Sequence, residues 1–141
     1  MKPLPTGLKN VTSYRVIYGD TDQMGVVYYA NFLRWFEKGR SEFLRQIGLP
    51  YKTIEQHGCH FPVTEVECRY SQPACYDDVV RIETELVAFR RATLIFNYRI
   101  SRATDNTLLA TGSTKHACLD SAGRVTRIPE TLAQAIKAAA S

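Results

Sequence analysis

The feature that most constrains the fold of this chain is the spacing of its apolar residues. Between about Tyr28 and Ile47 they recur every three to four positions, which predicts one long amphipathic helix. The residues of this stripe are Tyr29, Phe32, Leu33, Phe36, Phe43, Leu44 and Ile47. Gly39 lies on the stripe and would let a neighbouring backbone approach closely. Gly48, with Pro50 close behind, is typical of a helix end. Because the apolar face is wide, a sheet is expected to cover it.

Four segments after this helix alternate apolar and polar residues, as half-buried strands do. These segments are residues 62–70, 78–89, 93–101 and 107–119. Short turns separate them, so the strands are predicted to be mostly antiparallel. Residues 12–18 predict an earlier strand with Tyr14, Val16 and Tyr18 on one face, and Pro129 predicts the start of a short last helix. One helix packed across an antiparallel sheet gives an α+β fold, and the free sheet edges favour a homodimer or homotetramer.

Composition sets broad limits on the class of protein. A chain of 141 residues with 45% apolar and 23% charged residues predicts one globular domain over residues 1–141. The net charge of +4 is mild and its basic residues are scattered, so nucleic acid is not an expected partner. The sequence offers neither a membrane-spanning run nor an apolar signal core, which predicts a cytoplasmic protein. The cysteines are expected to be free and partly buried: Cys59, Cys68, Cys75 and Cys118.

Most motifs that carry chemistry are missing. His57, Cys59 and His60 are close together, but their spacing matches no zinc or iron site, so no metal is expected. Ser113 lies within a strand pattern rather than at a strand-to-helix turn, which argues against a serine nucleophile. A glycine-rich dinucleotide or phosphate loop is also lacking, and no cofactor is expected.

The remaining candidates are two aspartates between the first strand and the long helix, in the segment YGDTDQMGVVYYANFLRW. Asp20 is interpreted as a turn residue that bonds its own backbone. Asp22 either prepares the start of the helix, where the dipole favours an acid, or carries chemistry. The residues alone leave both interpretations of Asp22 open.

This segment resembles the signature of the 4-hydroxybenzoyl-CoA thioesterase family of hotdog-fold acyl-CoA thioesterases. The signature has an acid, a second acid, a small loop, G-[IV]-V-[YFW]-[YH] and then N-[YF]. The segments FPVTEVECRYSQPACYDDVVRIETEL and AFRRATLIFNYRI also resemble the family's later strands, so the likeness covers roughly residues 12–120. It implies a hotdog fold, in which an antiparallel sheet wraps around one long central helix. It also implies an acyl-CoA substrate. Coenzyme A is then part of the substrate and not a cofactor.

The resemblance assigns roles to particular positions. It places the catalytic carboxylate on Asp22 and gives the thioester carbonyl to the backbone N–H of Tyr29. The residues it implies for substrate binding are Gly25, Val27, Tyr28, Arg90 and Arg91, the two arginines serving the phosphates of coenzyme A. Gln23 and Tyr29 depart from residues common in the family, which leaves the preferred acyl group open.

Several alternatives stay open at this stage. Asp22 can act as a general base on water or attack the thioester directly. Glu37 is a competing carboxylate on the helix, although Arg34 and Arg40 are expected to pair with it on a solvated face. A dehydratase or hydratase of the same fold would need a histidine opposite the acid, and a non-catalytic protein that binds acyl thioesters is the third possibility.

Overall fold

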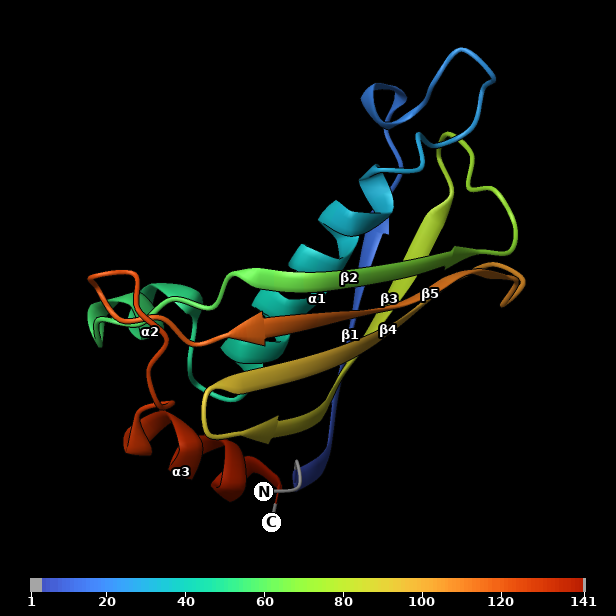
Figure 1. The fold of residues 1–141 in the computed structure, drawn as a ribbon. Coiled ribbons are helices and arrows are strands. Elements are labelled where there is room, and N and C mark those ends of the chain that lie inside the picture. The colour runs from blue at the N-terminus through green and yellow to red at the C-terminus, as the bar shows by residue number, and fades with distance from the viewer. Residues whose placement is uncertain (1–3, 141) are drawn as a thin grey trace.

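The structure is a computed structural model that describes residues 4–140 (Figure 1). Five strands, three α-helices and one short 3-10 helix make up this part of the chain. In chain order they are β1 (Leu4–Arg15), η1 (Tyr18–Asp20), α1 (Asn31–Gln46), α2 (Tyr51–Gln56), β2 (Val63–Tyr70), β3 (Val79–Arg90), β4 (Thr93–Arg102), β5 (Leu108–Ala117) and α3 (Glu130–Ala140). The predicted order of strand, long helix, four strands and last helix is confirmed.

The five strands form one antiparallel sheet in the order β1-β3-β4-β5-β2. β1 and β2 are therefore its two edges. Figure 1 shows α1 lying across one face of the curved sheet. The expected α+β arrangement of a sheet around one long helix is confirmed, and the sequence-based prediction of antiparallel pairing holds for every strand pair.

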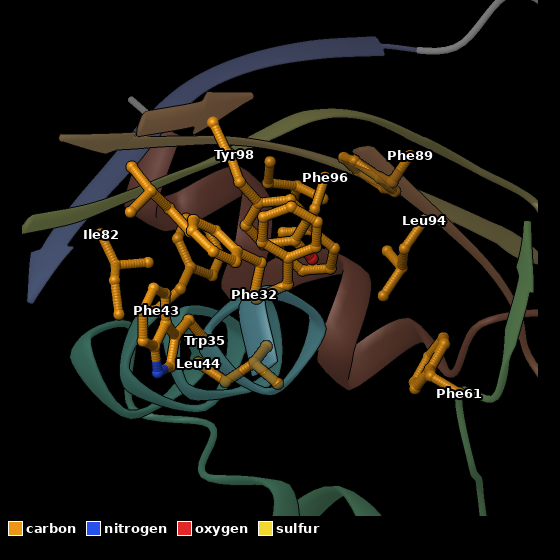
Figure 2. Close-up of a cluster of buried hydrophobic side chains, with 14 of the residues drawn as sticks. Phe32, Trp35, Phe43, Leu44, Phe61, Ile82, Phe89, Leu94, Phe96 and Tyr98 are labelled. Carbon is orange, nitrogen blue, oxygen red and sulfur yellow. The ribbon is translucent and has the colours of Figure 1, made fainter. Parts of the chain in front are cut away.

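The core lies between the inward face of α1 and the central strands (Figure 2). Phe36 of α1 stacks on Tyr98 of β4 with ring centroids 4.2 Å apart, and Phe43 meets the ring of Phe96 edge-on at 5.5 Å. All four of these rings are nearly inaccessible to solvent. Each large apolar side chain buried in this way contributes roughly 1.5–3 kcal/mol. Aromatic packing thus fixes α1 to the sheet.

Some predicted boundaries and faces are wrong. α1 begins at Asn31 rather than near Tyr28, because the residues before it form a turn. Tyr18 does not share a strand face with Val16: it belongs to η1 and is 71% exposed, whereas Val16 is buried. The short helix α2 was not predicted, since its single turn and a half is too short to show a helical period.

β2 also differs from its sequence pattern. Its apolar and polar residues alternate, yet nearly every one of its side chains is exposed. Val63, Val66 and Tyr70 are 44%, 50% and 47% exposed. β2 is an edge strand that meets α1 at its Tyr70 end, where the ring lies 5.2 Å from that of Phe32, and most of its length has no second layer to cover it. Alternation alone therefore does not bury one of its faces.

The sheet has two functionally different ends. At one end, the loop that follows β1 is tied to the loop between β2 and β3, because Val27 N–H donates to the carbonyl of Ala74 (2.8 Å). At the opposite end, the turn between β3 and β4 meets the segment before α3, where Ile128 N–H donates to the carbonyl of Arg91 (2.6 Å). Within residues 4–140, no helix is both long enough and apolar enough to cross a membrane.

Candidate active site

Asp22 lies in a tight loop between η1 and α1. Its N–H donates to the carbonyl of Val26 (2.8 Å), and the N–H of Gly25 donates back to the carbonyl of Asp22 (3.0 Å). Gly25 has a φ of 81°, in the left-handed region that glycine adopts without strain. A bridge between Thr21 and Val27 closes the base of the loop. The backbone therefore presents Asp22 in a defined position.

The Asp22 carboxylate is only partly engaged. One oxygen, Oδ1, accepts a hydrogen bond from the N–H of Met24 at 2.8 Å. The other oxygen has no partner among residues 4–140. The side chain is half-buried. Asp22 thus combines a fixed orientation with a free acceptor oxygen, as a catalytic carboxylate requires.

Asp20 holds this loop to its surroundings. It is only 6% exposed, and its Oδ2 accepts hydrogen bonds from the hydroxyl of Tyr14 (2.7 Å) and the N–H of Ile17 (2.9 Å). Its carbonyl accepts from the N–H of Tyr28 and from the side-chain amide of Asn31, both at 2.8 Å. The interpretation of Asp20 as a structural residue is consistent with these bonds, which reach from β1 to the start of α1.

The first turn of α1 leaves backbone donors unused. The N–H of Asn31 donates to the carbonyl of Tyr28 (2.9 Å), so Tyr29 and Ala30 are the two central residues of a turn that leads into the helix. Within the described chain, neither Tyr29 N–H nor Ala30 N–H has an acceptor. The Tyr29 carbonyl accepts from the hydroxyl of Tyr70 at 2.8 Å. Free N–H groups at a helix start attract negative charge.

Exposed apolar side chains surround the loop. Met24 is 83% exposed and Tyr29 is 61% exposed, and the ring of Tyr29 lies 4.7 Å from that of Tyr28 and 6.3 Å from that of Tyr70. Partial burial raises the pKa of the Tyr70 hydroxyl, which donates to the Tyr29 carbonyl. Exposed apolar clusters of this kind are typical of binding surfaces.

The predicted substrate-binding residues of this loop fall in different environments. Gly25 is exposed beside Asp22, and Tyr28 is 45% exposed. Val27 is only 5% exposed, so its side chain belongs to the core and only its backbone borders the loop. Of the three predicted residues, Gly25 and Tyr28 are therefore accessible at the surface, whereas the Val27 side chain is not.

Arg90 and Arg91 lie at the opposite end of the sheet from Asp22, at the turn between β3 and β4 (Figure 1). There they line a pocket of about 180 Å³ together with Arg127 and with Lys137 of α3. Within one chain, the structure does not bring this basic pocket together with the Asp22 loop. Arg127 and Lys137 are far from the hairpin in sequence, and no local motif indicated that they would join it.

A larger pocket lies beside the second half of α1. It has a volume of about 320 Å³, and its apolar wall comes from α1, the start of β2 and β4. Figure 2 shows Leu44, Phe61 and Leu94, which line this space. Its polar lining includes Arg40 and His116, which sequence reasoning missed. The signal for His116 was its position on the inward face of β5, where a polar residue is unusual.

His116 is a buried, neutral histidine. Its side chain is only 2% exposed, and both ring nitrogens are engaged, Nδ1 with the carbonyl of Phe61 (2.9 Å) and Nε2 with the hydroxyl of Thr114 (2.8 Å). Burial, aided by the charge of Arg40, lowers the pKa of His116 to about 4. It therefore lacks a free nitrogen for acid or base chemistry in this state.

Glu37 does not form the ion pairs predicted for it. Among residues 4–140, neither Arg34 nor Arg40 pairs with its carboxylate. Arg40 instead donates to the hydroxyl of Tyr98 at 3.1 Å. Glu37 is exposed and borders the 320 Å³ pocket, but it lies two turns along α1 from the free N–H of Tyr29. The arginines make contacts inside the fold that helical spacing could not indicate.

Comparison with known proteins identifies the family of this chain. The family model described as the thioesterase-like superfamily matches residues 16–136. The chain belongs to this superfamily. It is 39% identical over 108 residues to the acyl-CoA thioesterase YbgC of Haemophilus influenzae, covering 75% of this chain and 77% of that protein. The expected thioester hydrolase is confirmed by these relationships.

Solved structures of similar sequence share the fold. The protein TT1821 of Thermus thermophilus is 38% identical, with a TM-score of 0.86 over 91% of this chain and 97% of that one. The DHNA-CoA thioesterase of Staphylococcus aureus is 27% identical, with a TM-score of 0.85 over 90% of this chain and 87% of that one. The hotdog fold implied by the sequence is confirmed.

Proposed function

We propose that this thioesterase hydrolyses acyl-CoA compounds, with Asp22 as its catalytic carboxylate and the Tyr29 N–H as the donor to the thioester carbonyl. The observation that carries this assignment is the pairing of an acid that has one free oxygen with a helix start that has free N–H groups. A thioester carbonyl gains negative charge on its oxygen during attack. A hydrogen-bond donor that is already in position stabilises this charge and raises the rate roughly 10²- to 10³-fold.

Two routes lead to the same products. Asp22 removes a proton from water, the resulting hydroxide attacks the carbonyl carbon, and the tetrahedral intermediate expels the coenzyme A thiolate, which takes up the proton. Alternatively, Asp22 attacks the carbonyl itself, coenzyme A leaves, and water hydrolyses the mixed anhydride. Both routes need the ionised carboxylate and the same oxyanion donor.

We also propose that two copies of the chain pair through β2 to complete each site. β2 is an edge strand, and its Val63, Val66 and Tyr70 are about half exposed, as expected of a surface that another subunit covers. In an antiparallel two-fold pairing, the Tyr70 end of one β2 meets the Val63 end of the other. A tetramer would consist of two such dimers.

This pairing accounts for the distance, within one chain, between Asp22 and the predicted residues Arg90 and Arg91. Tyr70 contacts the Tyr29 turn, whereas Val63 lines the 320 Å³ pocket at the end of the sheet that also holds Arg90 and Arg91. In the proposed dimer, the Asp22 loop of one copy faces the pocket and the basic turn of the other. Arginines bind phosphates strongly, so Arg90 and Arg91 are proposed to hold the phosphates of coenzyme A.

The alternative activities have less support. A dehydratase or hydratase would need a histidine facing Asp22, but both ring nitrogens of His116 are engaged within the fold. His57 and His60 lie in no recognisable dehydratase motif. A non-catalytic role would not need a carboxylate with a free oxygen beside free helix donors.

Thiol release from a panel of acyl-CoA compounds tests the proposed activity. The panel contains short-chain, medium-chain, long-chain and aromatic acyl groups, and the expected result is release from at least one of them. Glu37→Gln is the matched control, because it removes the competing carboxylate on α1. We expect this variant to keep most of the activity. No release from any compound would contradict the function, and loss of release in Glu37→Gln would transfer the catalytic role to Glu37.

A further inference from the structure

A buried chain of hydrogen bonds connects Arg40 with the carbonyl of Phe61. The bonds run from Arg40 to the Tyr98 hydroxyl (3.1 Å), from there to Thr114 Oγ1 (2.6 Å), and on through His116 to Phe61 (2.8 and 2.9 Å). The direction of every bond is determined. A guanidinium only donates, a backbone carbonyl only accepts, and the neutral ring of His116 has one N–H, at Nδ1, and one acceptor, Nε2. Tyr98 therefore accepts from Arg40 and donates to Thr114, which donates to Nε2 of His116.

This chain holds one edge of the Arg40 guanidinium in place. Tyr98, Thr114 and His116 are each at most 3% exposed, so the anchor is rigid and excludes water. A guanidinium has five N–H donors, and this bond uses one of them. In the described part of the chain, no carboxylate forms an ion pair with Arg40. The remaining donors are available in the 320 Å³ pocket that Arg40 lines.

The rest of the pocket is mainly apolar. Its lining includes Leu44, Phe61, Leu94 and Phe96, all of them buried side chains. Its volume of about 320 Å³ is near the lower limit for pockets that hold small molecules, which favours a short or medium-length ligand. Such a pocket fits an apolar chain that ends in an oxygen acceptor for Arg40.

We propose that this pocket binds the acyl part of the substrate and that Arg40 selects acyl groups with a carboxylate at their far end. This inference rests on the proposed acyl-CoA hydrolysis, in which the pocket of one copy faces the Asp22 loop of its partner. The substrate class is then the mono-thioester of a dicarboxylic acid. Arg40 binds the terminal carboxylate, while the aliphatic part of the acyl chain packs against Leu44, Phe61 and Leu94.

Among residues 4–140, Glu37 is the one acidic residue that lines this pocket. Its carboxylate is exposed, so water and salt screen its repulsion of a bound anion. Arg40 is half-buried and its anchor is buried, so its attraction is screened less. His116 remains neutral above about pH 4 and adds no charge of its own. The balance of these groups favours an anionic ligand.

A matched pair of thioesters tests the proposal. Hexanoyl-CoA and adipoyl-CoA have acyl chains of equal length and differ only in the terminal carboxylate. We expect the wild-type protein to hydrolyse adipoyl-CoA with a kcat/KM at least roughly tenfold higher, since one charge-assisted hydrogen bond has about that effect. Reactions without protein give the spontaneous rate, which is subtracted.

Variants of Arg40 and of its anchor test the assigned residue. Arg40→Met keeps the length of the side chain and removes the charge, so the ratio of the two kcat/KM values is expected to fall to near one. Arg40→Lys keeps the charge and should retain much of the ratio. Tyr98→Phe removes only the anchoring hydroxyl, and we expect an intermediate ratio that arises mainly from a higher KM for adipoyl-CoA. Circular dichroism and melting temperature report whether each variant is folded.

The outcomes separate this proposal from the proposed function. Release from hexanoyl-CoA that equals or exceeds release from adipoyl-CoA in the wild-type protein overturns the role of Arg40 while hydrolysis stands. An Arg40→Met variant that is folded and keeps the full preference also overturns it. No release from any acyl-CoA, aromatic ones included, overturns both. The wild-type comparison decides the matter even if a variant does not fold.

Discussion

Asp20 and Asp22 have the same side chain and are two residues apart, Asp20 at the end of η1 and Asp22 in the loop that follows, yet they differ in burial and in the number of hydrogen bonds that their carboxylates accept. Asp20 is 6% exposed, and its carboxylate accepts from Tyr14 and Ile17. Asp22 is half-buried, and one of its oxygens accepts a single backbone N–H while the other has no partner in the described part of the chain. Burial and hydrogen bonding therefore assign structure to the first acid and leave the second available for chemistry.

Asp20 also supports the segments that hold Asp22 and Tyr29. Through its carbonyl, Asp20 fixes both the N–H of Tyr28 and the side chain of Asn31, the residue that begins α1. The loop with Asp22 and the turn with Tyr29 are thereby held on either side of Asp20. A catalytic carboxylate needs such support, since small errors in its placement greatly reduce the rate.

Replacing Tyr29 by proline extends the comparison to the backbone and should have the largest effect after the loss of the Asp22 carboxylate itself. Proline removes the N–H that we propose as the oxyanion donor, and position two of a turn accommodates it well. We expect kcat to fall roughly 10²- to 10³-fold. The melting temperature should change little, because this N–H has no acceptor in the fold. Full activity in a folded Tyr29→Pro variant would mean that another donor holds the carbonyl.

Asp20→Ala should affect folding instead of chemistry. It leaves the hydroxyl of Tyr14 and the N–H of Ile17 without their acceptor, and we expect the free energy of unfolding to fall by about 2–4 kcal/mol. Urea denaturation followed by circular dichroism measures this change. A stability equal to that of the wild-type protein would contradict the structural role of Asp20.

The pH dependence of the free energy of unfolding tests the buried position of His116, in contrast to the exposed position of Asp22. Its pKa is lowered to about 4 by burial, whereas an unfolded histidine has a pKa of about 6.5. Between these values the unfolded chain binds more protons, so the free energy of unfolding decreases as pH falls, by up to about 3 kcal/mol. His116→Asn removes the titrating group and should flatten this slope.

Urea titrations at several pH values between about 4.5 and 7 compare the slopes of the two proteins. Since His116→Asn keeps an N–H that can donate to Phe61, the variant should remain folded near neutral pH. Parallel slopes would show that His116 is not the group responsible.

Tyr14→Phe should have the smallest effect. It removes one of the two donors to the Asp20 carboxylate and keeps the packing of the ring on Trp35, with centroids 5.8 Å apart. The expected loss of stability is about 1–2 kcal/mol. Combined with Asp20→Ala, it should add little, because both changes remove the same bond. Full additivity of the two effects would mean that this hydrogen bond does not contribute.

The sequence predicted those features that follow from local spacing. Phe32, Phe36, Phe43 and Leu44 of the predicted stripe are buried, and the alternation in β3, β4 and β5 reflects burial, so the element order and the antiparallel sheet could be predicted. The stripe is wrong at Tyr29 and Leu33, which are 61% and 38% exposed. Gly39 was correctly singled out for close approach, although the neighbours that need the space are the side chains of Thr84 and Ile82 rather than a backbone.

Features that depend on contacts distant in sequence could not be predicted. The bond from Arg40 to Tyr98 joins residues 58 positions apart, so helical spacing assigned Arg40 to Glu37 instead. The exposure of β2 follows from its place at the sheet edge, which its composition does not reveal. The assignment of Asp22 came from the family signature, because the loop residues alone were also compatible with an acid that only favours the helix start.

The most direct test of the central claim is thiol release by Asp22→Asn per folded chain. Asparagine keeps an oxygen for the N–H of Met24 but cannot act as base or nucleophile, so the turn is preserved and only the chemistry is lost. We predict a fall in kcat of roughly 10²- to 10⁴-fold with a free energy of unfolding within about 1 kcal/mol of the wild-type value. Unchanged release from a folded Asp22→Asn variant would contradict the account.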